Sequence, residues 1–187
     1  MSTSWVVLVI LAAIAVYAVL LFNRLVKTRQ MAKEGWSGID VQLKRRADLV
    51  PNLVETVKGY AAHESALFEE IARLRSEVGR LDSGDVTHRG QLEGLLSGVL
   101  GRLLALAEAY PDLKASDNFL DLQASLVEIE DEIQMSRRYY NGAARNLNVI
   151  AQSFPSNLIA RIFSFDSREY FEIDAVDRKV PEVSIGG

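Results

Sequence analysis

The 187-residue sequence contains no cysteine and only two histidines. Without thiols the chain can form neither disulfide bonds nor thiolate metal sites, and it has no cysteine nucleophile. Two imidazoles, those of His63 and His88, make a multi-histidine metal centre hard to build. Basic residues are also outnumbered, with 21 Lys and Arg against 25 Asp and Glu and a net charge of −4. That charge is not the profile of a dedicated nucleic-acid-binding protein, so we expect no nucleic-acid partner.

Common enzyme motifs are missing as well. The sequence has no glycine-rich phosphate loop and no Gly-x-Ser-x-Gly elbow. It has no Glu-x-x-His motif of the kind that holds metals in helical bundles, and His63 beside Glu64 is better explained as a polar helix boundary. We therefore expect no enzymatic activity, no cofactor, no metal site and no small-molecule substrate.

One long apolar run stands near the start of the chain. Residues 5–22, from Trp5 to Phe22, are 18 consecutive apolar residues without a charge, glycine or proline. As a helix they would rise about 27 Å, close to the ~30 Å hydrocarbon core of a bilayer. A cleaved signal peptide is the alternative, but residues 1–4 lack the basic side chains of a signal n-region. We expect residues 1–23 to form a retained single-pass membrane anchor.

The charges around this run predict its direction. Arg24, Lys27 and Arg29 follow the apolar residues, whereas no basic side chain precedes them. The positive-inside rule then places the N-terminus outside and the rest of the chain on the cytoplasmic side of the cell (inner) membrane. The same cations can also hold anionic headgroups of the lipid bilayer, at about 1 kcal/mol each.

After the anchor, apolar residues recur at spacings of three and four, which is the helical pattern. Three such series cover residues 43–78, 92–110 and 119–151, and no window shows sustained period-two alternation. Residues 82–85 and Pro111 separate the series, and Pro155 ends the last one. We expect an all-α protein. An antiparallel up-and-down bundle of three long helices and a short fourth at residues 156–163 occupies residues 24–173, with heptad-type, coiled-coil-like packing. Residues 174–187 form an extended tail.

Pro51 lies inside the first expected helix, which we take to run from the membrane to Leu81. Pro51 has no backbone N–H, so it cannot donate the helical hydrogen bond to the carbonyl of Ala47. Because the apolar spacing continues on both sides, the sequence predicts a kink at Pro51 rather than a helix end.

The expected helices have unequal lengths. The first would extend about 88 Å beyond the membrane, whereas the second would span only about 37 Å. The second helix then cannot cover the stripe of Trp36, Ile39, Leu43 and Ala47. This stripe must meet the C-terminal segment, another copy of the chain, or another membrane or cytoplasmic protein. We favour self-association through these residues as the candidate interaction face.

Two further patterns have weaker meanings. Gly90, Gly94 and Gly98 share one helix face, a spacing that favours close helix contact. The acidic run at residues 128–132 is most simply a solvated helix face, with a docking patch for a basic partner as the alternative. The basic run at residues 44–46 is short and is offset by Asp40 and Asp48.

Residues 36–64, which contain Trp36-Ser37-Gly38-Ile39-Asp40 and Leu49-Val50-Pro51-Asn52-Leu53, resemble the signature block of the bacterial LemA family. Residues 107–115 (Ala-Glu-Ala-Tyr-Pro-Asp-Leu-Lys-Ala) and residues 137–141 (Arg-Arg-Tyr-Tyr-Asn) agree, and the likeness covers roughly residues 20–175. The resemblance implies a membrane-anchored helical bundle with no known catalytic residues or cofactor. Some members are associated with magnetosome membranes, which suggests membrane organisation. This chain departs from the family at residues 142–146 and 183–187.

Two functions fit these features better than a third, a hydrolase or metal-dependent enzyme whose site is assembled from residues distant in the sequence. The first is a membrane-anchored scaffold or adaptor that acts through protein contacts or self-association. The alternative is a membrane receptor or signalling subunit, in which Pro51 and the glycine face allow the bundle to change conformation when a partner binds.

Overall fold

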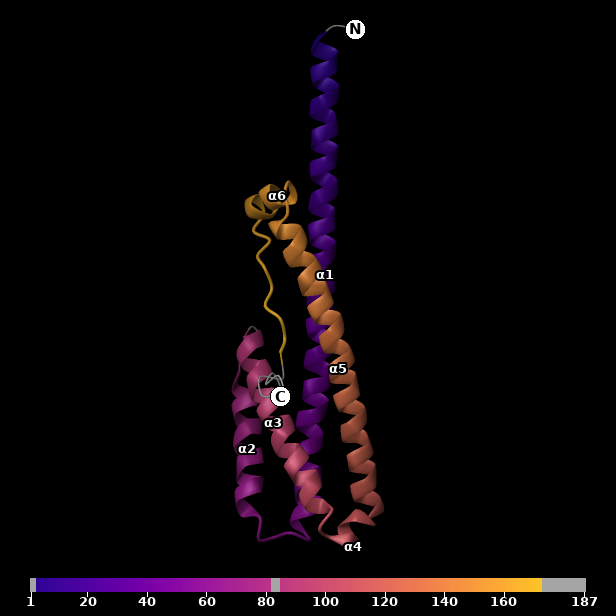
Figure 1. Cartoon of the computed structure of the whole chain (residues 1–187), viewed down its shortest axis with the longest axis vertical. Coiled ribbons are helices and arrows are strands. Elements are labelled where there is room, and N and C mark those ends of the chain that lie inside the picture. Colours follow the sequence, from indigo (N-terminus) through magenta and orange to yellow (C-terminus); the bar gives the residue numbers. More distant parts are fainter. Residues whose placement is uncertain (1–2, 82–84, 173–187) are drawn as a thin grey trace, which may run out of the picture. The chain divides into compact units, whose positions relative to one another are not determined.

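The computed structural model describes residues 3–81 and 85–172, which form helices and connecting turns without a strand (Figure 1). The all-α prediction is confirmed. The elements in chain order are α1 (Thr3–Lys58), α2 (Ser65–Arg80), α3 (Val86–Ala107), α4 (Pro111–Lys114), α5 (Asp117–Gln152) and α6 (Ser156–Ile162). The expected tail at residues 174–187 and most of the first expected loop lie outside the described residues.

The chain divides into two compact units. The anchor unit comprises Met1–Val41 and Ile133–Tyr170, and the core unit comprises Gln42–Glu132 and Phe171–Gly187. Two helices, α1 and α5, pass without interruption from one unit into the other. Each unit therefore has its own packing, which we describe separately.

The apolar run forms the first part of α1 and packs against almost nothing in the chain. It is long and apolar enough to cross a membrane, and none of its apolar window is buried. Burial begins at the end of the run, where Phe22 is half-buried and Leu25 is fully buried. In the anchor unit Leu25 packs with Leu147, Ile150 and other residues of α5 and α6. The sequence thus changes from an uncovered helix to a packed helix within one turn.

The first helix ends earlier than the sequence indicated. We expected it to reach Leu81, but α1 ends at Lys58 and the chain turns before α2 begins at Ser65. Gly59 has low helix propensity and Glu64 interrupts the apolar spacing, which accounts for the break. His63 lies in this turn, as expected of a polar boundary residue.

This correction shortens the helix that the bundle must cover. From residue 24 to its end, α1 has 35 residues and a length of about 52 Å rather than about 88 Å. The chain after the turn folds back as α2, which packs against α3. The mismatch in helix lengths that suggested an uncovered stripe is therefore much smaller.

The core unit is filled mostly by aliphatic side chains from α1 to α5. Its fully buried members include Leu53 and Val57 of α1, Ile71 of α2, Leu103 of α3 and Leu113 of α4. Several α2 residues, namely Leu67, Phe68, Ile71 and Leu74, turn their side chains into this core. Helix α4 begins with Pro111 at its first turn, where the missing N–H costs nothing.

Pro51 lies within α1, and the helix continues through it as expected. Pro51 has no N–H to offer the carbonyl oxygen of Ala47, one turn earlier. The side chain of Arg75 on α2 supplies the missing donor, with Nε 2.9 Å from that oxygen. A side chain from a second helix thus satisfies the carbonyl that proline leaves without a helical partner.

Candidate functional site

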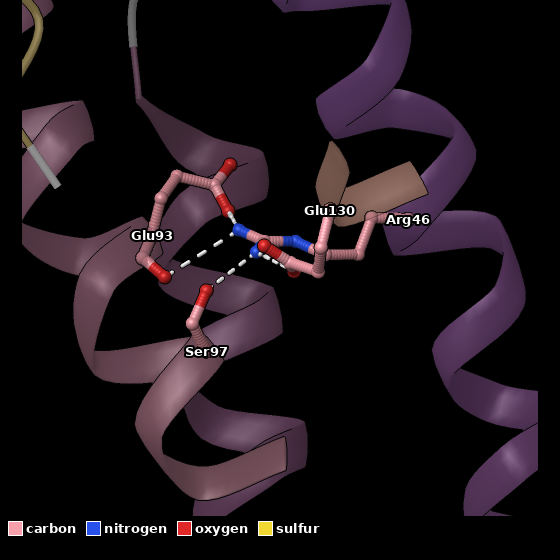
Figure 2. Close-up of polar contacts among 4 residues, drawn as sticks. All are labelled: Arg46, Glu93, Ser97 and Glu130. Carbon is pink, nitrogen blue, oxygen red and sulfur yellow. Dashed lines mark hydrogen bonds and ion pairs between the residues drawn. The ribbon is translucent and has the colours of Figure 1, made fainter. Parts of the chain in front are cut away.

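A buried polar cluster in the core unit joins three helices. Arg46 projects from α1 toward Glu93 and Ser97 on α3 and toward Glu130 on α5 (Figure 2). Arg46 Nη1 donates to Ser97 Oγ at 2.6 Å and to Glu130 Oε1 at 2.5 Å. Its Nη2 donates to the carboxylate of Glu93 and, more weakly, to the Glu93 carbonyl oxygen at 3.4 Å. One guanidinium therefore connects α1, α3 and α5.

The cluster is buried to different depths. The side chains of Arg46 and Glu93 are 0% and 1% exposed, whereas that of Glu130 is 32% exposed. Arg46 Nε and Glu93 Oε1 are buried and form no hydrogen bond. A buried guanidinium between two carboxylates holds its helices together strongly only while every partner is present, because an unpaired buried charge is costly.

Burial and charge pull in opposite directions within this cluster. Burial disfavours the charged guanidinium of Arg46, but attraction to Glu93 and Glu130 outweighs it and raises the Arg46 pKa. Burial raises the pKa of the Glu93 carboxyl, and the charge of Arg46 offsets this only in part. The cluster therefore favours the charged form of Arg46, whereas burial makes the charged form of Glu93 less favourable.

The sequence interpretation missed this cluster. It treated the acidic run at residues 128–132 as a solvated face and gave the basic run at residues 44–46 no special role. In the structure the Arg46 side chain is 0% exposed, and the Glu130 side chain is only partly exposed, at 32%. A signal existed, because Arg46 lies three residues after Leu43 and four before Val50, in phase with the buried side of α1. Glu93 likewise lies between buried Leu92 and Leu96. A charge in phase with a buried stripe indicates a buried ion pair.

The candidate interaction face is mostly interior. Ile39 is 0% and Leu43 2% exposed, while Trp36 and Ala47 are half-buried. In the anchor unit the Trp36 ring lies 5.5 Å from the Tyr140 ring of α5. This chain's own residues therefore cover much of the stripe, which was one of the three possibilities, and Ile39 and Leu43 are not exposed to a partner.

The glycine face does not pack uniformly. A methyl group at Gly90 would collide with the backbone of Glu172, whereas one at Gly98 would meet nothing within 4 Å. A second close approach occurs at Gly35 in the anchor unit, where a Cβ would come within 2.9 Å of Tyr140 Cα. The sequence spacing identified one of these two tight contacts and missed the other.

Hydrogen bonds fix the extended segment after α6 onto α5 of the anchor unit. The hydroxyl of Tyr140 donates to the Glu169 carbonyl at 2.8 Å, and burial raises the Tyr140 pKa. Asn148 binds the backbone of Arg168 through both its amide nitrogen and its amide oxygen, at 2.9 and 2.7 Å. These contacts hold the chain between α6 and Tyr170 in place.

Aromatic rings surround the end of the apolar run. The Phe22 ring lies 4.8 Å from that of Phe163 and 5.8 Å from that of Phe165, both edge to face. Arg29 places its guanidinium 4.5 Å from the centre of the Phe165 ring. Arg24 and Lys27, which follow Phe22 in the sequence, are exposed. Among residues 3–81 and 85–172, no group of three or more histidine or acidic side chains could hold a metal ion.

Comparison of the sequence with known proteins identifies related proteins. Magnetosome protein MamQ 2 of Paramagnetospirillum magneticum is 31% identical over 193 residues, covering 89% of this chain and 71% of the relative. Magnetosome protein MamQ of Magnetospirillum gryphiswaldense is 28% identical, covering 80% and 64%. Protein LemA of Metamycoplasma hominis is 27% identical, covering 83% and 71%. The profile of the LemA family matches residues 35–185, and the chain belongs to this family of membrane-associated proteins.

Proposed function

We propose that this protein is a membrane-anchored, non-enzymatic scaffold or adaptor, whose helical bundle binds other proteins or a second copy of the chain. The observation that carries this proposal is the continuity of α1. One helix of 56 residues contains the uncovered apolar run and also contributes buried side chains to both units. Because the helix is continuous, a protein that binds the bundle is held at the membrane that the apolar run crosses.

The orientation is part of the proposal. With Arg24, Lys27 and Arg29 after the apolar run, the N-terminus lies outside the cell membrane and the bundle lies in the cytoplasm. A membrane-impermeant thiol reagent tests this on intact cells, because the natural chain has no cysteine. Thr3→Cys should react and Met135→Cys, at an exposed position of α5, should react only after lysis. The opposite pattern would invert the topology.

The names of the relatives support a role at a membrane. Two of the relatives described above are called magnetosome proteins, and this chain aligns with most of its own length to each. A scaffold that arranges proteins at a membrane is consistent with that name and with a bundle built around an anchor helix.

Contacts must use side chains that the single chain leaves exposed. These include Val41 of α1 at the end of the anchor unit, and Leu95 of α3 and Val127 of α5 in the core unit, which are 53%, 52% and 54% exposed. To test the proposal, a photoreactive amino acid is placed at each of these positions in turn. The full chain is then crosslinked in its native membrane. We expect at least one position to give a defined adduct with this chain or with one other protein.

The matched control is a charged residue at the position that gives the adduct, for example Val127→Glu. It should abolish recovery of the same partner from a tagged chain while leaving membrane fractionation unchanged. Absence of any adduct from all three positions, in membranes that retain the protein, would overturn the scaffold proposal.

A further inference from the structure

Four large apolar side chains around α6 are exposed in the anchor unit. Phe154 and Ile162 are 81% and 74% exposed, and Leu158 and Phe163 are 52% and 54% exposed. Leu158 and Ile162 are four residues apart on α6 and therefore share one face. The opposite side of α6 is packed, since Ala160 is buried in the cluster around Leu25. The helix is thus held by one side and presents an apolar surface on the other.

This surface lies beside the end of the membrane-spanning run. Phe163 follows directly after α6, and its ring contacts that of Phe22, the last residue of the run. Because α6 has seven residues and a length of about 10 Å, its whole apolar face lies close to Phe22. Figure 1 shows α6 alongside the upper part of α1. A bilayer that ends at Phe22 would therefore meet α6 at its surface.

The charges nearby match an anionic lipid surface. Residues 22–33 contain four basic and no acidic side chains, and residues 153–166 contain one of each, Arg161 and Asp166. Exposed cations next to exposed apolar side chains are typical of helices that lie in the headgroup region. A second copy of the chain would instead bring these like charges together, which disfavours it as the occupant.

We propose that α6, together with Phe154 and Phe163, is a second membrane contact that lies in the headgroup region and buries its apolar face among lipids. This inference rests on the membrane anchor of the proposed function. Two attachments at one membrane surface, the span and α6, restrict the tilt of the anchor unit relative to the bilayer. The anchor alone would leave that tilt free.

The absence of cysteine allows a direct test in the full chain. An environment-sensitive fluorophore is attached to Ile162→Cys or Leu158→Cys, and the protein is reconstituted in phosphatidylcholine vesicles with phosphatidylglycerol. We expect blue-shifted emission and quenching by lipids that carry a quencher on their acyl chains. Met135→Cys is the matched control, because Met135 is an exposed apolar residue (48%) on α5 of the same unit. It should stay red-shifted and unquenched.

Val9→Cys, within the apolar run, separates failure of the anchor from failure of this inference. If Val9→Cys is quenched by lipid and both α6 positions behave like Met135→Cys, the α6 contact is overturned and the anchor stands. If Val9→Cys is not quenched, the anchor and the inference fail together. Blue-shifted α6 probes that lipid quenchers do not reach would show a protein occupant and would also overturn the inference.

The basic side chain on α6 gives a second readout. Arg161→Gln should reduce lipid quenching at Leu158→Cys in vesicles with phosphatidylglycerol and have little effect in phosphatidylcholine alone. An equal effect in both vesicles would contradict the electrostatic part of the inference.

Discussion

The anchor unit and the core unit both bury aliphatic side chains, but they differ in the other contacts that join their helices. In the anchor unit, rings and close backbone approaches join α1, α5 and α6, as at Phe22, Trp36 and Gly35. In the core unit, mostly aliphatic side chains fill the interior and one buried ionic cluster crosses it. Aliphatic packing is tolerant of substitution, whereas buried charges and tight backbone contacts depend on single residues. The two units should therefore respond differently to mutation.

The largest expected effect is the loss of the buried cation in the core unit. Arg46→Met leaves the carboxylate of Glu93 buried without its partner, which should lower the free energy of unfolding by about 3–5 kcal/mol. Arg45→Met is the matched control, because Arg45 is exposed and binds only its neighbour Gln42 in the described contacts. Denaturant unfolding of the full chain in detergent, followed by circular dichroism, measures both.

The double variant Arg46→Met with Glu93→Leu separates pairing from packing. Removing both charges should restore most of the loss, since an apolar replacement of a buried ion pair is often neutral. A loss in the double variant as large as in Arg46→Met alone would show that shape, rather than charge, matters at this site.

In the anchor unit we expect the next largest effect from Gly35→Ala. The new methyl group would lie 2.9 Å from Tyr139 Cδ1 and from Tyr140 Cα, so α1 and α5 must separate. Overpacking of this kind costs about 1–3 kcal/mol. Gly142→Ala on α5 meets nothing within 4 Å and should instead gain up to about 1 kcal/mol in helix propensity. Thermal unfolding should move in opposite directions, and equal shifts would contradict the close approach.

A smaller loss of stability is expected at the contact between Arg75 of α2 and the Ala47 carbonyl, which Pro51 leaves without a helical donor. Arg75→Ala should cost about 0.5–1.5 kcal/mol in the natural chain, because it removes the donor to the Ala47 carbonyl. In a Pro51→Ala background the backbone N–H returns, so the same change should cost less. A double-mutant cycle measures the difference. Additive effects would show that Arg75 does not act through this carbonyl.

The smallest effect concerns pH. Burial raises the pKa of Glu93 above its usual range in the folded state, so the native chain binds its proton more tightly than the unfolded chain does. The stability that this protonation supplies is present at low pH and is lost as the pH rises through the folded pKa. The natural chain should gain stability relative to Glu93→Gln as the pH falls from neutral toward the usual glutamate pKa. Denaturant unfolding at several pH values tests the sign, and the opposite trend would refute it.

Several features followed directly from local sequence. The helix ends near Pro111 and Pro155 and the short helix after Pro155 were predicted because proline and polar turn residues act on their own neighbours. The break at residues 59–64 was missed because the apolar spacing resumes in phase on the far side. Periodicity alone cannot distinguish one bent helix from two helices that pack together.

The candidate site was harder to predict than the fold. Arg46 is 47 residues from Glu93 and 84 from Glu130. The apolar phase indicates that Arg46 and Glu93 are buried, but it does not indicate which residues they pair with. The same holds for Gly35, whose close neighbour Tyr140 lies on another helix. Contacts of this range depend on which helix faces pair, and a helical pattern does not specify that.

The sequence by itself determined the helical class, the long apolar run and the basic residues that follow it, because each depends on spacing or composition within one segment. Tertiary structure alone decided that Ile39 and Leu43 are interior, that Arg46 is shared by two carboxylates, and that Phe163 meets Phe22. The physical reason is that the burial of a side chain depends on which other helix packs over it. The local sequence around that side chain does not specify this helix.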